Sequence, residues 1–354
     1  MARPRHFPLT WSAARAVALL ASAAMLALPA AMATGPFPAA AATTSTSTPR
    51  AHTRYVPLEG SAKVLLYEKL TSAKLQTRYT RYSSSVLRAL TASGKREQLG
   101  ELGTDASISL AGSTVVVVNP PPLDNGDPTA TGDLLRWWNL STGAHGHLVT
   151  REDFAGATPG GWMYERSDGG VGHLVAVSFD GTRTELGEPF PNGVPFGVLP
   201  GPDGYLAIAE DPDDFGDGAA IYTPYAHPDR PVTLIPKTSP GEECNGLSST
   251  YAACNLDSDK MTLLPLSGAK PVTTRTCEDI PYVYKSNAVW LPRDGCDEGR
   301  LGELSKTGHV TFSTRTYERY DMTVALGKII VTTKDERELL TLTSATATPK
   351  VLLN

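Results

Sequence analysis

Carboxylates are concentrated in one short stretch, EDPDDFGDG at residues 210–218. Within it, Asp211, Asp213, Asp214 and Asp217 place four carboxyl groups within seven residues, next to flexible glycines. Such a loop can hold calcium, a hard cation that takes about six to eight oxygen ligands. It departs from the EF-hand loop, because a phenylalanine replaces the third acid and no glutamate closes the loop. A calcium site and a solvated acidic turn are therefore both open interpretations, and calcium is the one cofactor that the sequence suggests.

No other stretch matches a catalytic motif. The sequence has no HExxH zinc motif, and GLSST at 246–250 lacks the second glycine of a GxSxG nucleophile turn. His145 and His147 can share a metal with a third ligand, or they can form the polar edge of a strand. No basic run occurs, and phosphate contacts require clustered Lys and Arg. We therefore expect no nucleic-acid partner.

Strands must position these residues, because a strand-turn-strand pattern recurs along the chain. HLVAVSFDGTRTEL at 173–186 is one of seven such segments. Their turn residues are separated by 49, 38, 47, 40, 40 and 37 residues; they are Gly94, Gly143, Gly181, Pro228, Gly268, Gly308 and Ala345. A period near forty built only from strands is typical of β-propeller blades.

A blade has four strands, so a second apolar hairpin is expected before each of these segments. It can be read at 107–118, 196–209, 281–292 and 322–333. Strands such as TVVVV are apolar at every position, which indicates that both faces of each sheet are buried. The adjacent Trp137-Trp138 would then both belong to the core; an exposed aromatic platform for a ligand is the alternative.

The predicted fold is an all-β, seven-bladed β-propeller, with six or eight blades as alternatives. Counted from the hairpin at 55–69, every blade is complete, so the ring closes without an additional N-terminal strand. The pattern resembles the TolB-like and WD40-like propeller repeats: GPDGYLAIAE at 201–210 is similar to their Pro-Asp-Gly turn, and VSFDGTRTEL at 177–186 to their outer hairpin. This resemblance covers nearly the whole chain after residue 54 and implies a fold but no reaction.

The four cysteines fit the predicted hairpins. Cys244 and Cys254 are symmetric about the turn at Ser249, and Cys277 and Cys296 are symmetric about the next inner turn. Residues that face each other across a hairpin have Cα atoms roughly 4.5 to 5.5 Å apart, within the reach of a disulfide. Of the three pairings open to four cysteines, we predict Cys244–Cys254 and Cys277–Cys296.

Residues 1–33 have the features of a secretory signal peptide, with arginines before an Ala/Leu run and small residues at its end. A retained membrane anchor is the alternative, because the run approaches the length of a spanning helix. Residues 34–54, rich in Thr, Ala, Ser and Pro, are expected to be a disordered linker before a propeller at 55–354. Loss of the three leader arginines changes the formal net charge from −5 to −8. We expect a secreted, extracellular monomer with no membrane span after signal cleavage.

The connections between the second and third strands of the predicted blades are acidic, and alternating strand directions place them on one face of the disc. Besides the 211–217 stretch, they contain Asp124, Asp127, Asp168, Asp257, Asp259, Asp294, Asp297, Asp335 and Glu336. This face would attract a cation, a basic peptide or a cationic sugar, although Asp is also a favoured turn residue.

We expect a non-enzymatic propeller that binds an extracellular protein, peptide or glycan on this acidic face. The alternatives are a hydrolase or lyase that uses channel-lining carboxylates or a divalent metal, and a structural envelope protein with no specific ligand.

Overall fold

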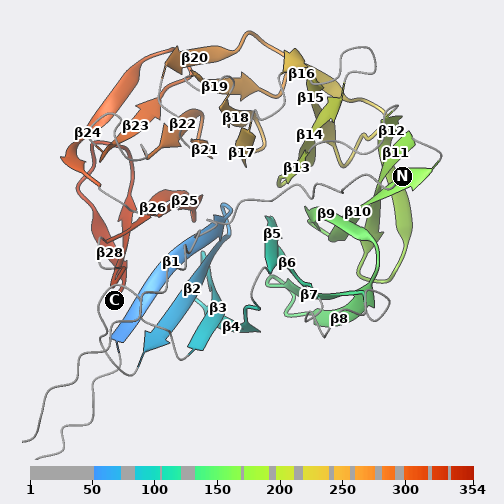
Figure 1. The fold of residues 1–354 in the computed structure, drawn as a ribbon. Coiled ribbons are helices and arrows are strands. Elements are labelled where there is room, and N and C mark those ends of the chain that lie inside the picture. The colour runs from blue at the N-terminus through green and yellow to red at the C-terminus, as the bar shows by residue number, and fades with distance from the viewer. Residues whose placement is uncertain are drawn as a thin grey trace, which may run out of the picture.

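The computed structural model describes residues 52–354 except for 73–83, 104–105, 121–131, 169–170, 191–196, 211–217, 239–242, 256–259, 276–280, 292–298, 318–320 and 334–335. The described strands form seven four-stranded antiparallel sheets. The sheets are arranged around a common axis, with one strand of each nearest the centre (Figure 1). The chain is therefore a seven-bladed β-propeller, which confirms the predicted fold and blade count. The described residues contain no helix long and apolar enough to cross a membrane.

Each blade uses four consecutive strands, ordered from the axis outward. The first four blades contain β1 (His52–Gly60), β2 (Val64–Ser72), β3 (Ser84–Thr91) and β4 (Arg96–Glu101); β5 (Ser107–Ala111), β6 (Thr114–Asn119), β7 (Asp133–Asn139) and β8 (His145–Thr150); β9 (Asp153–Thr158), β10 (Gly161–Asp168), β11 (Val171–Ser178) and β12 (Arg183–Phe190); and β13 (Gly197–Pro200), β14 (Gly204–Glu210), β15 (Gly218–Pro224) and β16 (Val232–Thr238). The last three contain β17 (Glu243–Leu247), β18 (Tyr251–Asn255), β19 (Lys260–Pro265) and β20 (Val272–Arg275); β21 (Pro281–Tyr284), β22 (Asn287–Trp290), β23 (Arg300–Leu304) and β24 (Val310–Thr316); and β25 (Met322–Ala325), β26 (Lys328–Thr332), β27 (Leu339–Leu342) and β28 (Lys350–Leu353).

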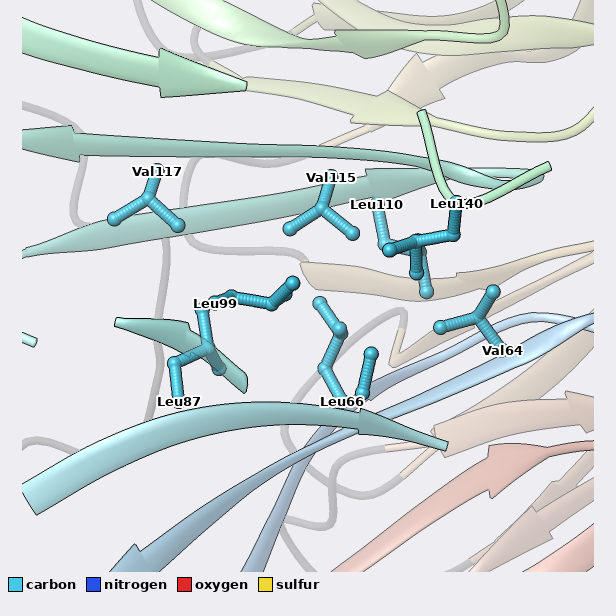
Figure 2. Close-up of a cluster of buried hydrophobic side chains, with 9 residues drawn as sticks. Val64, Leu66, Leu87, Leu99, Leu110, Val115, Val117 and Leu140 are labelled. Atoms are coloured by element: carbon cyan, nitrogen blue, oxygen red, sulfur yellow. The ribbon is translucent and has the colours of Figure 1, made fainter. Parts of the chain in front are cut away.

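Both faces of the inner strands are buried, as the unbroken apolar runs predict. On β6, Val115 and Val117 pack with Leu66 and other side chains of blade 1 (Figure 2). Val116 faces the other way and packs with Trp162 of blade 3. Because full burial of such a side chain is worth about 1.5 to 3 kcal/mol, inter-blade packing on both faces stabilises the ring.

The adjacent tryptophans of β7 also pack on opposite faces of their sheet. Trp137 packs between blades 2 and 3, where its ring is stacked on Phe179 with a centroid distance of 4.3 Å. Trp138 faces blade 1, and the Arg136 guanidinium lies 5.6 Å from its ring centroid. Both rings are half-buried and contact the core on opposite faces of the sheet.

The ring closes by packing between blades 1 and 7, because each sheet contains strands from its own blade only. Leu65 of blade 1 shares a buried cluster with Ile330 of blade 7. Two backbone hydrogen bonds cross the same junction: Tyr55 N–H donates to Glu336 O (2.6 Å), and Leu326 N–H donates to Ser61 O (2.7 Å). The predicted closure without an additional strand is confirmed.

Strand β1 begins at His52, inside the segment 34–54 that we expected to be a linker. The reason is the length of β2, whose Leu70, Thr71 and Ser72 pair with Arg54, Thr53 and His52. The predicted signal peptide and the rest of the linker lie outside the described residues and stay predictions.

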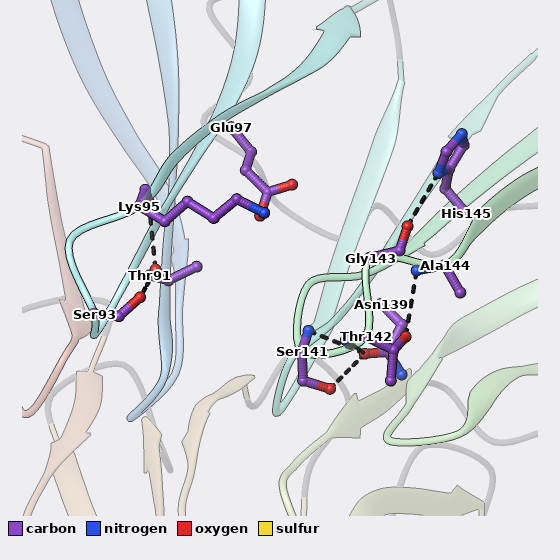
Figure 3. Close-up of polar contacts among 10 residues, drawn as sticks. All are labelled: Thr91, Ser93, Lys95, Glu97, Asn139, Ser141, Thr142, Gly143, Ala144 and His145. Atoms are coloured by element: carbon purple, nitrogen blue, oxygen red, sulfur yellow. Dashed lines mark hydrogen bonds and ion pairs between the residues drawn. The ribbon is translucent and has the colours of Figure 1, made fainter.

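The outer hairpins have the turn chemistry that their sequences predict. Gly94, Gly143 and Gly181 adopt positive φ angles of 85°, 78° and 87°, a conformation that glycine tolerates at little cost. In the second blade, Asn139 Oδ1 accepts hydrogen bonds from the N–H groups of Ser141 (3.1 Å) and the following threonine (3.2 Å) (Figure 3). This Asx turn fixes the hairpin tip locally.

The first predicted disulfide is present. Cys244 on β17 pairs with Cys254 on β18 across the hairpin, with Cα atoms 3.9 Å apart. Cys277 and Cys296 lie outside the described residues, so their pairing stays a prediction. The hairpin of β21 and β22 that they flank does form.

We expect the double variant C244S/C254S to lose about 2 to 3 kcal/mol of unfolding free energy, because the bond closes a short loop in the unfolded chain. Guanidinium unfolding of the full chain measures this loss. C277S/C296S should lose a similar amount, and the denatured, unreduced wild type should have no thiol that reacts with a thiol reagent. Two reactive thiols in the wild type would contradict the Cys277–Cys296 pairing.

Candidate functional site

The predicted calcium ligands Asp211, Asp213, Asp214 and Asp217 all lie outside the described residues, so the calcium site stays a prediction. Glu210 pairs with Gly218 at the ends of β14 and β15, so this stretch does connect the second and third strands of blade 4. Elsewhere in the part of the chain that the structure describes, no three His, Cys, Asp or Glu side chains are close enough to hold a metal ion.

His145 and His147 lie on the same side of β8, and both are exposed. A ring nitrogen of His145 lies 3.2 Å from the carbonyl oxygen of Gly143 (Figure 3). No described side chain joins the two imidazoles as a third metal ligand. The polar-edge interpretation of this pair is therefore the one that the described residues support.

The predicted acidic face of the disc, which we call the loop face, is described only in part. It carries the starts of the innermost strands and the connections between second and third strands. Two of the predicted acidic residues are described there, and both are ion-paired: Asp168 with Arg166 (2.8 Å) and Glu336 with Arg54 (3.8 Å). The others lie outside the described residues; they are Asp124, Asp127, Asp257, Asp259, Asp294, Asp297 and Asp335.

Three other acids form what we call the carboxylate cluster, at the loop-face ends of blades 2 and 3. Asp133 is the first residue of β7, and Asp153 is the first residue of β9. Glu165 of β10 lies directly opposite Asp153 in the strand register. None of the three forms an ion pair with a basic residue of the described chain.

The carboxylate cluster carries more negative charge than its surroundings compensate. Burial, and secondly the charge of Asp153, raise the pKa of Glu165 to about 7. The same two causes raise the pKa of Asp133. Like charges at cross-strand distance destabilise a sheet, so the charge of Asp153 adds an unfavourable interaction with both Glu165 and Asp133.

Sequence reasoning missed this cluster because it considered only the connections. Asp133 and Asp153 are the first residues of strands, and Glu165 lies inside a strand, in GWMYERSD. The available signal was a glutamate directly after the buried run GWMY of this strand. Its cross-strand neighbour Asp153 could not be predicted, because the pairing of β9 with β10 includes a register irregularity between Met163 and Tyr164.

A second perturbed carboxyl group lies near the axis. Glu59 is the penultimate residue of β1, the innermost strand of blade 1. Desolvation by the surrounding strands raises the pKa of Glu59 to about 7, although the residue itself is exposed to solvent. Because strand β1 runs away from the loop face, Glu59 lies toward the opposite face from the carboxylate cluster.

No family model matches the chain, and no curated protein matches it. Solved structures do resemble it. A structure from a study of two prolyl endopeptidases has a TM-score of 0.54 and 12% identity over 86% of this chain and 50% of that one. An acylaminoacyl peptidase of Pyrococcus horikoshii has a TM-score of 0.51 and 10% identity over 87% of this chain and 53% of that one. The β-propeller domain of the Trilobed protease of Pyrococcus furiosus has a TM-score of 0.44 and 10% identity over 86% and 98%.

The likeness shows the fold alone. This chain spans about half the length of the two peptidases, at identities too low to carry an activity across. The predicted propeller is confirmed, while the resemblance to TolB-like and WD40-like repeats stays a prediction.

We expect E165Q to be more stable than the wild type at pH 8 and no more stable at pH 4. The pKa of Glu165 is raised in the folded state, so its ionisation costs stability as pH rises through about 7. Glutamine imitates the protonated form at every pH. Thermal unfolding measured from pH 4 to pH 8 tests this.

E185Q is the matched control, because Glu185 lies on the same blade but is exposed and ion-paired with Arg166 at 2.6 Å. It should show no gain at pH 8. A constant difference between E165Q and the wild type over the whole pH range would contradict the assignment.

Proposed function

We propose that this protein is a secreted, non-enzymatic propeller that binds the basic segment of an extracellular protein or peptide on its loop face. The observation that carries the proposal is the repulsion of Asp133 and of Glu165 by Asp153, in a cluster where no described basic residue forms an ion pair with these acids. The other described acids of that face, Asp168 and Glu336, are already paired with arginines.

The carboxylate cluster suits the charged side chains of a partner better than a metal ion. Its members are not close enough together to be metal ligands among the described residues. They are close enough for their charges to interact. Lys and Arg side chains on a partner can reach such separated carboxylates one by one, and each contact lowers the repulsion.

Binding of a basic partner should also depend on pH. A basic side chain of the partner stabilises the ionised form of Glu165. The affinity of the protein for a basic partner should therefore rise as pH increases through about 7. The field of the cluster should steer association and weaken in salt.

We expect a fluorescent peptide of alternating Lys and Gly to bind the full chain more tightly at pH 8 than at pH 6. D153N/E165Q should weaken the binding about tenfold at pH 8, because two charges are lost. Fluorescence anisotropy at low and physiological salt measures both effects.

E97Q/D229N is the control, because it removes the same net charge from two acids that already have basic neighbours. Glu97 is paired with Lys95 (2.9 Å) and Asp229 with Arg230 (3.7 Å). Equal binding by D153N/E165Q and the wild type would overturn the proposal.

A propeller hydrolase or lyase is the second candidate, and one observation favours it. Glu59 and Glu165 both have a pKa of about 7. A carboxyl group that is partly protonated at neutral pH can act as a general acid.

If this candidate is right, the full chain should cleave members of a panel of glycans, lactones and peptides. E59Q should then reduce kcat while the fold is retained in circular dichroism. Activity that is absent over the whole panel, with calcium and with EDTA, contradicts the enzyme.

A further inference from the structure

A groove of about 730 Å³ lies on the outer part of the propeller between blades 2 and 3. Seven consecutive residues, 146–152, form one side of it. Successive residues of a strand point to opposite faces of the sheet. A groove lined by consecutive residues therefore follows the backbone edge of β8, and it continues inward between the facing sides of blades 2 and 3, where Trp162 and Val177 also line it.

Strand β8 is the outermost strand of blade 2 and pairs only with β7. Its outer N–H and C=O groups therefore face no other strand of the sheet, which is the usual template for pairing with another chain. Native edges are normally blunted by charged residues or proline.

The seven outermost strands, all of them described, allow a direct comparison. Six of them contain at least one Lys, Arg, Glu or Pro: REQLGE, RTELGEPF, VTLIPKT, VTTR, VTFSTRT and KVLL. Strand β8 is HGHLVT and contains none of these residues or Asp. Its Val149 is 63% exposed. The sequence of strand β8 thus lacks the charged residues and prolines that the sequences of the other six edge strands contain.

The floor of the groove is aromatic. Trp137 and Phe179, from different blades, are stacked with a centroid distance of 4.3 Å and both line the groove. Gly146 lies under the indole, and a Cβ atom there would be 2.7 Å from Trp137 Cζ2. The glycine therefore lets the ring lie flat against the strand and offer an apolar surface beside its edge.

The charges of the groove have a direction. Arg183 Nη1 forms an ion pair with Glu152 (2.8 Å) and donates a hydrogen bond to Tyr164 OH (2.7 Å). The charges of Arg183 and Glu152 therefore neutralise each other. Arg151 and Asp180 remain. Arg151 follows the loop-face end of β8, whereas Asp180 lies in the outer hairpin turn at the other end. Among its lining residues, the groove therefore has the cation Arg151 at one end, an apolar floor and the anion Asp180 at the other end.

We propose that the β8 edge binds an extended peptide segment of another protein by strand addition. The backbone edge supplies the hydrogen bonds, the Trp137–Phe179 floor takes an apolar side chain, and the two end charges set the direction. The complementary segment carries an acid near Arg151 and a Lys or Arg near Asp180. This site adjoins the carboxylate cluster at its loop-face end, where Asp133 pairs with Thr150 of β8, but strand addition along the β8 edge does not depend on the proposed function.

The probe is the peptide ETVYVTK, with KTVYVTE as its reversed partner. Because β8 runs toward the loop face, an antiparallel peptide has its N-terminus near Arg151, and antiparallel pairing is the commoner kind. We expect ETVYVTK to bind the full chain more tightly than KTVYVTE in isothermal titration. Amide hydrogen exchange should slow at β8 and not at the other outermost strands.

Val149→Lys places on β8 a charged residue of the kind that other outermost strands carry and that disfavours strand pairing. It should weaken ETVYVTK binding about tenfold. Val351→Lys is the matched control, because Val351 is 55% exposed on β28, the outermost strand of blade 7, and should leave binding unchanged. N-methylation of one alternate set of peptide amides should abolish binding, and methylation of the other set should not, because only alternate amides face β8. D153N/E165Q should leave the sensitivity to N-methylation unchanged, because neither carboxyl group takes part in the backbone hydrogen bonds to β8.

Equal weakening by both lysine variants, or binding that is insensitive to N-methylation, would overturn the proposal. So would a wild-type dimer that V149K converts to a monomer, because the occupant would then be a second copy of this chain.

Discussion

The structure depends on the requirement that each sheet bury both of its faces against neighbours. A four-stranded sheet alone leaves its apolar faces in water. When seven such sheets pack around an axis, both faces of each sheet are buried against the neighbouring sheets. Strand β6 shows the consequence most directly, since Val115 and Val116 are fully buried although they point in opposite directions. The ring also closes through this packing, because Leu65 and Ile330 meet between the first and last blades without a shared strand.

The same requirement determines where binding sites can lie. Side chains in the middle of the inner strands are needed for packing, so the chemistry is left to strand ends, connections and outer edges. The carboxylate cluster lies at strand ends, where Asp133 and Asp153 begin their strands. The β8 groove lies along an outer edge. The first offers charge and the second offers backbone hydrogen bonds, so the two sites select different features of a partner.

Local spacing was enough to predict the fold. The forty-residue period, the glycine turns and the Cys244–Cys254 pair all depend on contacts within one hairpin, which are close in sequence. The candidate sites were not predictable in this way. Glu165 acquires its raised pKa from Asp153 through a pairing with a register shift, and Trp137 meets Phe179 across two blades. Acidity alone was misleading too, because Asp168 is neutralised by Arg166, two residues earlier in the strand.

A repeated architecture supplies its own internal comparison. Each of the seven outermost strands pairs with the third strand of its own blade on one side and has no strand on the other. Each therefore carries the same risk of pairing with the edge strand of another molecule. Packing cannot explain why β8 alone lacks charge and proline, because its equivalents satisfy the same packing with those residues present. A difference confined to one blade, beside a groove with an aromatic floor and opposite charges at its ends, therefore requires a cause specific to that blade. A partner strand is such a cause, because it removes the hazard by occupying the edge.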